Sequence, residues 1–193
     1  MRTGVIAALV ALLSLCGCGA EDLYTSDYAC RFVFNAKYHP GTTIETALNS
    51  PGVYTMISAG KVGGVWHIYS TLNDGQDNTE DIRLNTAEEN YADYSDLGAA
   101  NGIIIGQCRY FDVTTGRPVL VAWDRQCANC LRDHGGLRYP LRWTGNGQSV
   151  ECANCGRIYA LETGAVTEGD PGISLFRYRI SYAGIGSVVS VGN

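Results

Sequence analysis

Short hydrophobic or alternating segments, separated by glycine- and proline-containing turns, make up most of the chain after residue 27. Such segments are typical of β-strands, because a period of two places every second side chain on the same face of a sheet. The expected strands cover residues 31–34, 53–58, 65–70, 81–85, 103–105, 118–123, 173–182 and 185–191. The pattern therefore predicts an all-β fold made of antiparallel sheets.

Two segments depart from the strand pattern. Residues 42–49 are expected to form a short helix, because Thr42 or Thr43 can cap its first turn and Pro51-Gly52 follows its end. Residues 86–90 are expected to form a single helical turn.

Two further features of the pattern bear on the topology. The run Ile103-Ile104-Ile105 is fully apolar and suits a strand that is buried on both faces. Residues 173–182 and 185–191 are expected to pair as a closing hairpin. The composition agrees with a fold rich in strands and turns, since the 193 residues include 24 glycines and 12 tyrosines and only 17% are charged.

The N-terminus has the features of a signal peptide, which we expect to cover residues 1–17. Arg2 gives it a positive start. Residues 5–15 form an apolar run that is too short to cross a bilayer as a helix of the mature protein.

The residues around Cys18 resemble a bacterial lipobox, in which leucine stands three residues before the modified cysteine and a small residue stands directly before it. Leu15 and Gly17 occupy these two positions. Cys16 fits less well, since Leu15 would then stand at the small-residue position. The resemblance implies cleavage before Cys18 and lipidation of its sulfur. The alternative is an ordinary secretory signal with an incidental cysteine.

Residues 18–27 are then expected to form a lipidated tether that leads to a single domain, residues 28–193. The acyl chains would anchor the protein in the cell envelope as an outer-membrane lipoprotein. The tether begins with Gly19-Ala20-Glu21-Asp22, which resembles an acidic signal that exports lipoproteins to the surface of some diderm bacteria. Surface exposure is therefore a further expectation.

The charge balance argues against nucleic acid as a partner. The chain carries 14 Lys and Arg against 19 Asp and Glu, and no run of basic residues stands in it. We therefore expect contact with the membrane through the lipid anchor rather than through surface charge.

Two identical tetrapeptides, Cys-Ala-Asn-Cys, stand at residues 127–130 and 152–155, with 21 residues between them. A C-x2-C turn lets two thiolates bind one ion, and two such turns together supply a tetrahedral site of four sulfurs. The sequence therefore predicts a metal centre whose ligands are Cys127, Cys130, Cys152 and Cys155.

Disulfides are the alternative to a metal, because thiols oxidise in the compartment of an exported protein. A metal is favoured, since a disulfide framework rarely repeats one tetrapeptide and C-x2-C disulfides are often redox-active rather than structural. Arg125, Arg132 and Arg157 flank the two motifs and could offset the negative charge of four thiolates around a divalent ion.

The stretch that begins at Cys152 resembles the second cluster-binding loop of Rieske iron–sulfur domains. In that family Cys-x-x-His-Gly is followed by an aromatic residue, a Thr-Gly turn and a proline. The matching positions are Gly156, Tyr159, Gly164 and Pro171. The flanking strands 118–123, 175–180 and 188–191 also resemble the family, so that the resemblance covers about residues 102–193.

The resemblance implies Rieske-like antiparallel sheets and a small metal-binding lobe at residues 124–165, similar to rubredoxin or a zinc ribbon. The ligands depart from the family, whose clusters are held by two cysteines and two histidines. Cys155 stands at one histidine position, and Asn129, followed by Cys130, stands at the other. A high-potential couple tuned by imidazole is therefore not expected.

Three centres stay open, namely Zn²⁺, a mononuclear Fe as in rubredoxin, and an all-cysteine [2Fe–2S] cluster. Two symmetric C-x2-C motifs favour one tetrahedral ion, Zn²⁺ or mononuclear Fe. The expected function is that of a metal-stabilised binding or structural domain with an unknown protein partner. The alternative is an electron-transfer protein with a redox partner.

The remaining candidate residues carry weaker predictions. Cys30 and Cys108 could form a disulfide or be buried thiols. His134, four residues after Cys130, could be a spare ligand, although a turn residue beside Gly135-Gly136 is favoured. The sequence has no G-x-S-x-G, H-E-x-x-H or phosphate-binding glycine loop, so no catalytic residues are predicted.

Overall fold

The computed structural model describes residues 23–76 and 78–193. The expected signal peptide, Cys18 and the start of the tether therefore lie outside the described residues. The strands, in chain order, are β1 (Arg31–Asn35), β2 (Tyr54–Val62), β3 (Val65–Leu72), β4 (Thr79–Arg83), β5 (Ile103–Phe111), β6 (Pro118–Asp124), β7 (Leu141–Trp143), β8 (Ser149–Cys152), β9 (Ile158–Ala160), β10 (Val166–Glu168), β11 (Arg179–Ser181) and β12 (Val188–Gly192). The helices are α2 (Thr43–Asn49), α3 (Thr86–Glu89) and α4 (Ala128–His134). None of these helices has the length and apolar character needed to cross a membrane.

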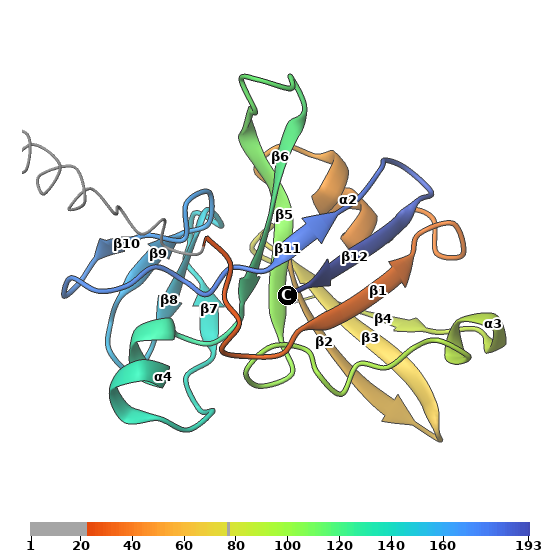
Figure 1. The fold of residues 1–193 in the computed structure, drawn as a ribbon, viewed down its shortest axis with the longest axis horizontal. Helices are drawn as coiled ribbons and strands as arrows, with labels where there is room; N and C mark the ends of the chain where they lie inside the picture. The colour runs from red at the N-terminus through yellow and green to blue at the C-terminus, as the bar shows by residue number, and fades with distance from the viewer. Residues whose placement is uncertain (1–22, 77) are drawn as a thin grey trace, which may run out of the picture.

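The strands form antiparallel sheets, which confirms the all-β prediction (Figure 1). The largest sheet has the order β4-β3-β2-β5-β6, and a second has the order β1-β12-β11. The third sheet, β10-β9-β8-β7, forms a lobe together with α4. The lobe lies beside the unit that the other two sheets form (Figure 1).

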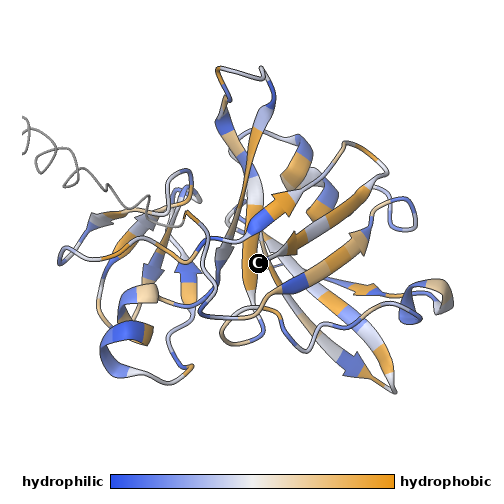
Figure 2. Ribbon diagram, viewed as in Figure 1, coloured by the Kyte–Doolittle hydropathy of each residue, from blue (hydrophilic) through white to orange (hydrophobic). Residues whose placement is uncertain are grey.

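The five-stranded sheet has a hydrophobic core on each of its faces. One core, shared with the sheet β1-β12-β11, includes Ile103 and Ile105, whereas the other reaches into the lobe and includes Ile104. All three side chains are fully buried, which confirms the expectation for this run. Figure 2 shows the hydrophobic residues concentrated in the strands of these two sheets. The division between two cores follows from the alternation of side chains along a strand.

The two expected short helices are also present, and each is capped by its own side chains. Thr42 caps α2 by accepting a hydrogen bond from the N–H of Glu45. Asn85 and Glu88 form a capping box at α3, in which each side chain accepts from the backbone N–H of the other residue.

The first expected strand of the closing hairpin forms only in its last part, as β11. Residues 173–177 instead form an extended strap between the lobe and the larger unit. The Leu175 N–H donates to the Gly164 carbonyl of the lobe at 2.8 Å. The Phe176 carbonyl accepts from the Asp124 N–H of β6 at 2.9 Å. Its partners thus lie partly in the turn between β9 and β10 of the lobe and partly in β6 of the larger unit, and the strap is not a regular strand of either sheet.

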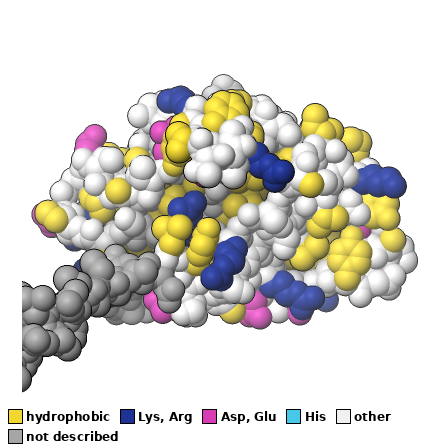
Figure 3. Space-filling view, turned by 45° about the horizontal axis from the view of Figure 1, so that its top comes forward, with side chains coloured by type: hydrophobic (Ala, Val, Ile, Leu, Met, Phe, Trp, Pro, Cys, Tyr) yellow, Lys and Arg dark blue, Asp and Glu magenta, His cyan; other side chains and the backbone are white. Residues whose placement is uncertain are grey.

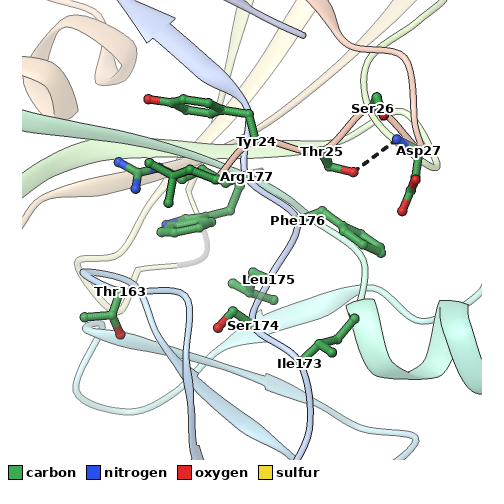
Figure 4. Close-up of a pocket in the computed structure, with 12 residues that line it drawn as sticks. Tyr24, Thr25, Ser26, Asp27, Thr163, Ile173, Ser174, Leu175, Phe176 and Arg177 are labelled. Carbon is green, nitrogen blue, oxygen red and sulfur yellow. Dashed lines mark hydrogen bonds between the residues drawn. The ribbon is translucent and has the colours of Figure 1, made fainter. Parts of the chain in front are cut away.

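Residues 23–27, expected to be the end of a tether, lie against the strap. The Thr25 N–H donates to the Arg177 carbonyl at 2.8 Å. The guanidinium of Arg177 lies over the rings of Tyr24 and Trp123, at 5.5 and 5.4 Å from the ring centroids. The segment and the strap line a groove of about 540 Å³ (Figure 4). Residues 24–27 therefore pack against the strap in the described part of the chain.

The possible disulfide between Cys30 and Cys108 is not formed, since both residues are buried free thiols. Cys30 belongs to the core shared with the sheet β1-β12-β11, and Cys108 belongs to the core that reaches into the lobe. The alternation along β5 turns Cys108 to the same face as Ile104. The five-stranded sheet therefore separates the two sulfurs.

The surface mixes charged and apolar side chains. On the face shown in Figure 3, Lys and Arg side chains lie in small groups among hydrophobic and uncharged ones. The hairpin of β5 and β6 projects beyond the sheet (Figure 1) and exposes apolar side chains near its turn, namely Tyr110, Phe111 and Val113.

Asp124, at the end of β6, holds the junction between the larger unit and the lobe. Its fully buried carboxylate accepts hydrogen bonds from the N–H groups of Ala99 and Gln126 and from the Tyr178 hydroxyl, each at 2.7 Å. Burial raises the pKa of Asp124, and these hydrogen bonds act in the opposite direction. A Cβ at Gly98 would lie 2.6 Å from a carboxylate oxygen of Asp124, so a side chain there would displace the carboxylate.

We expect the substitution Asp124→Ala to lower the free energy of unfolding by about 3 kcal/mol, because it leaves buried donors without an acceptor. Urea denaturation measures this loss. Asp96→Ala, at an exposed position, serves as the control and should change the stability by less than about 0.5 kcal/mol. Equal effects of the two substitutions would show that the carboxylate does not hold the junction.

Candidate metal centre

The lobe is inserted into the chain between β6 and β11, two strands of the larger unit. Its sheet is made of strands with only three or four residues each. The lobe was predicted to end at residue 165, but β10 continues its sheet to Glu168. Sheets of this size bury little apolar surface, so the lobe needs further interactions to hold its shape.

The first Cys-Ala-Asn-Cys motif forms the beginning of helix α4. Cys127 is the N-cap residue, with an extended backbone, and Cys130 lies within the first turn of the helix. The Cys127 N–H donates to the Tyr139 carbonyl at 2.9 Å, which joins the start of the helix to the chain before β7. Residues three apart lie on one face of a helix, so both sulfurs point to the same side.

The second motif has a different backbone, a tight turn between β8 and β9. Cys152 is the last residue of β8, and its carbonyl accepts from the Gly156 N–H at 2.8 Å. Gly156 has a φ of 69°, which favours glycine and turns the chain back into β9. The Cys152 N–H donates to the Arg157 carbonyl at 3.0 Å. The hairpin thus brings Cys155 close to Cys152.

The structure brings the four predicted ligands together. Their sulfur atoms all lie within 4.8 Å of one another. The Sγ atoms of Cys127 and Cys155 are 3.7 Å apart, as are those of Cys130 and Cys152. Ligands at 2.3 Å from a tetrahedral ion lie roughly 3.8 Å apart, since the edge of a tetrahedron is about 1.6 times its centre-to-corner distance. The arrangement is therefore compatible with a single metal ion.

The disulfide alternative is absent at these residues. All four cysteines are free thiols, and the shortest sulfur–sulfur distances of 3.7 Å exceed the length of an S–S bond. Both short contacts join one motif to the other. An ion at their centre would therefore tie helix α4 to the β8–β9 hairpin.

Each sulfur also has a hydrogen-bond partner. The Tyr159 hydroxyl lies 3.0 Å from the Cys127 sulfur, and the Asn154 side-chain amide donates to the Cys130 sulfur at 3.3 Å. The backbone N–H groups of Asn154 and Cys155 point to the Cys152 sulfur. Such donors orient thiolate ligands and stabilise their negative charge.

Burial and hydrogen bonding act in opposite directions on the thiol pKa values. Burial raises the pKa of Cys152 to about 11, and it also raises the pKa of Cys130. At the half-exposed Cys155 burial acts in the same direction, but hydrogen bonds from the backbone and the guanidinium of Arg157 lower its pKa to about 7. The pKa of the Cys155 thiol is therefore lowered, whereas burial raises the pKa values of the Cys130 and Cys152 thiols.

Asn129 connects the centre to the strap. Its side-chain amide donates to the Tyr159 hydroxyl and to the Ile173 carbonyl, each at 2.8 Å. Its side-chain oxygen accepts from the Ile173 N–H at 2.9 Å. A Cβ at Gly172 would lie 2.2 Å from that oxygen, so this contact requires glycine. The repeated asparagine was visible in the sequence, but its role depends on the strap and was not predicted.

The flanking arginines have three different roles. Arg157 reaches the Cys155 sulfur, as expected from the charge of the centre. Arg132 instead contacts Asn129 and forms an ion pair with Asp133 at 2.8 Å. Arg125 lines a cleft between the lobe and the five-stranded sheet.

His134, considered as a spare ligand, is exposed at the end of α4. It is not among the residues whose ligand atoms converge in the described part of the chain. Its ring lies 6.2 Å from that of Tyr139. The favoured interpretation as a turn residue agrees with this position.

Comparisons of the chain with protein-family models, with curated proteins and with solved structures found no match. The resemblance to Rieske domains therefore rests on the sequence motif alone.

We expect Tyr159→Phe to weaken metal binding by about 10- to 100-fold, because it removes the hydroxyl next to the Cys127 sulfur. Competition with a chromophoric chelator measures the affinity. Tyr139→Phe, in the same lobe, is the matched control and should keep the affinity of the unmodified protein. If Tyr159→Phe binds the metal as tightly as the control, the hydroxyl does not support the ligand.

Proposed function

We propose that this protein is an exported lipoprotein with a binding or structural domain, stabilised by one zinc ion at Cys127, Cys130, Cys152 and Cys155. The observation that carries the proposal is the convergence of four sulfurs within 4.8 Å, with the closest contacts between the two motifs. Zinc prefers four thiolates in a tetrahedral arrangement, and a site closed by four protein ligands is typical of structural zinc.

The structural role follows from the small size of the lobe. Three of the four ligands are buried and belong to the same hydrophobic core as Tyr159 and Leu141. A structural zinc site contributes about 10 kcal/mol of folding free energy, which is comparable with the net stability of a whole domain. Without the ion, the strands of three or four residues would have to hold the lobe alone.

Electron transfer by a mononuclear iron is the second candidate, and the position of Cys155 favours it. This ligand is half-exposed, whereas the other three are buried. A partly exposed sulfur gives an electron a short path to a partner at the surface. A [2Fe–2S] cluster is less favoured, because its thiolate pairs bind different irons and stand farther apart than four sulfurs within 4.8 Å.

The export and the lipid anchor are supported by the sequence of residues 1–22, namely the apolar run and the lipobox-like residues before Cys18. The Rieske-like origin of the domain is likewise a proposal. Its support is the sequence motif and the position of the lobe, which is inserted between two strands of a larger β unit. The proposed location is the cell envelope, with the domain on a membrane surface.

Elemental analysis and a visible spectrum of protein purified without oxygen distinguish the metals. We expect one zinc per chain and no visible absorption, because zinc has a filled d shell. Cys152→Ser should lose the metal and lower the melting temperature sharply. Cys108→Ser, at a buried thiol outside the centre, should keep the metal and serves as the control.

The outcomes separate the candidates. A coloured protein with one iron per chain would favour electron transfer instead of the zinc-stabilised domain. Full metal occupancy in Cys152→Ser, or a melting temperature equal to that of the control, would remove the basis for a structural metal.

Lipidation is tested by expressing the full chain in a diderm bacterium with a radiolabelled fatty acid. We expect the label to enter the protein and to be lost in Cys18→Ala. Cys16→Ala, which changes the neighbouring cysteine, should retain the label. Labelling of Cys18→Ala would contradict lipidation at Cys18. Release of the unmodified chain into the periplasm without label would show that residues 1–17 are an ordinary secretory signal.

A further inference from the structure

A cleft of about 470 Å³ lies between the five-stranded sheet and strand β7 of the lobe. It is separate from the metal centre, whose cysteines do not line it. One wall is formed by side chains of β2, β3 and β4, and the other by side chains of β7. The volume is in the range of sites for small molecules.

The sheet wall is rich in hydroxyl groups that stand side by side. Ser58 pairs with Tyr69 across β2 and β3, and Met56 pairs with Thr71. Thr71 pairs in turn with Thr79 of β4, and their hydroxyls are 3.0 Å apart. Paired residues point to the same face of a sheet. The wall therefore offers hydrogen-bonding groups and an aromatic ring to a molecule in the cleft.

Arg125, the residue after β6, brings an unpaired positive charge to the cleft. The ion pairs among residues 23–76 and 78–193 join other side chains, and the Arg125 Nε atom is buried without a hydrogen-bond partner. A half-buried cation without an anion is costly, so a negative charge in the cleft would stabilise this side chain.

The unpaired state of Arg125 differs from that of Arg177, the other arginine with a buried, unpartnered Nε. Arg177 lies over the rings of Tyr24 and Trp123, which offset its charge. Arg125 has no such ring in the described part of the chain. The aliphatic part of the Arg125 side chain packs against Gly102. A Cβ at Gly102 would lie only 2.9 Å from the Arg125 Cδ, so this contact leaves no room for a side chain there.

The lobe wall adds a second cation and a second unpaired donor. Arg142 lines the cleft and is exposed, and it is likewise outside the ion pairs of the described residues. Trp143 lines the cleft too, and its indole Nε1 is buried without a partner. Two guanidinium groups, one indole and a row of hydroxyls thus surround one space.

From this juxtaposition we propose that the cleft binds a small organic oxyanion, a carboxylate or phosphate ester with a ring-shaped body. Arg125 and Arg142 hold the anionic group, since guanidinium groups match the geometry of carboxylate and phosphate oxygens. Tyr69 and Trp143 contact the ring, and the threonine and serine hydroxyls bind its polar substituents. This site goes beyond the proposed metal function and assigns the domain a ligand.

Isothermal titration calorimetry of the metal-loaded protein at fixed ionic strength tests the proposal, with phenyl phosphate, benzoate and glucuronate as probes. At least one of these anions should bind, and the neutral analogue benzyl alcohol should not. Arg125→Gln and Arg142→Gln should each weaken binding by at least about tenfold. Arg138→Gln, at an exposed position of the lobe outside the cleft, should leave it unchanged.

A second readout separates ligand binding from a structural role of the buried arginine. Arg125→Met should abolish binding and keep or raise the melting temperature of the ligand-free protein, because it removes a buried, unpaired charge. A structural arginine would instead lower the melting temperature when replaced. The metal content should equal that of the unmodified protein in every variant.

Three results would overturn the proposal. The first is an absence of binding for all three anions at concentrations up to about 10 mM. The second is equal affinity in Arg125→Gln, Arg142→Gln and the Arg138→Gln control. The third is binding of inorganic phosphate as tight as that of phenyl phosphate, which would show that the walls of the cleft do not recognise an organic body.

Discussion

Mutual repulsion among four sulfur ligands is the constraint on which the lobe depends. Four thiolates within 4.8 Å of one another could not share this space without a cation at their centre. The shortest contacts run between the motifs, from α4 to the β8–β9 hairpin. An ion bound there, as proposed above, would cross-link these two local structures, and strands of three or four residues would then suffice for the rest of the lobe.

The parts of the fold that depend on local patterns were predictable from the sequence. Alternation and apolar runs predicted strands of the two sheets of the larger unit but none of the short strands β7 to β10 of the lobe. The three consecutive isoleucines predicted a strand with a core on both faces. The C-x2-C spacing predicted the ligands, because the chelating geometry is contained within four residues. The strap at residues 173–177 was not predictable, since its hydrogen bonds go to the lobe at Gly164 and to β6 at Asp124, which only the folded chain brings together. The sequence left Cys30 and Cys108 open between a disulfide and buried thiols, because the sheet that separates the two sulfurs exists only in the folded chain.

Two identical tetrapeptides adopt different backbones in this protein. The first opens a helix and the second forms a turn, as their flanking residues dictate. The asparagines differ accordingly, since Asn154 donates to a sulfur whereas Asn129 binds the backbone of the strap. At the position where the Rieske motif has a histidine ligand, Asn129 thus serves to attach the lobe to the larger unit. The two identical motifs thus place their sulfurs in one cluster, but the asparagines within them have different hydrogen-bond partners.

The strap has a mechanical consequence. Thr25 is hydrogen-bonded to the strap at Arg177, and Asn129 is hydrogen-bonded to the same strap at Ile173. A pulling force applied to the N-terminal segment would therefore travel along the strap to the helix that carries Cys127 and Cys130. With the proposed ion bound, its bonds to the four sulfurs would bear part of this tension and would limit how far helix α4 separates from the β8–β9 hairpin.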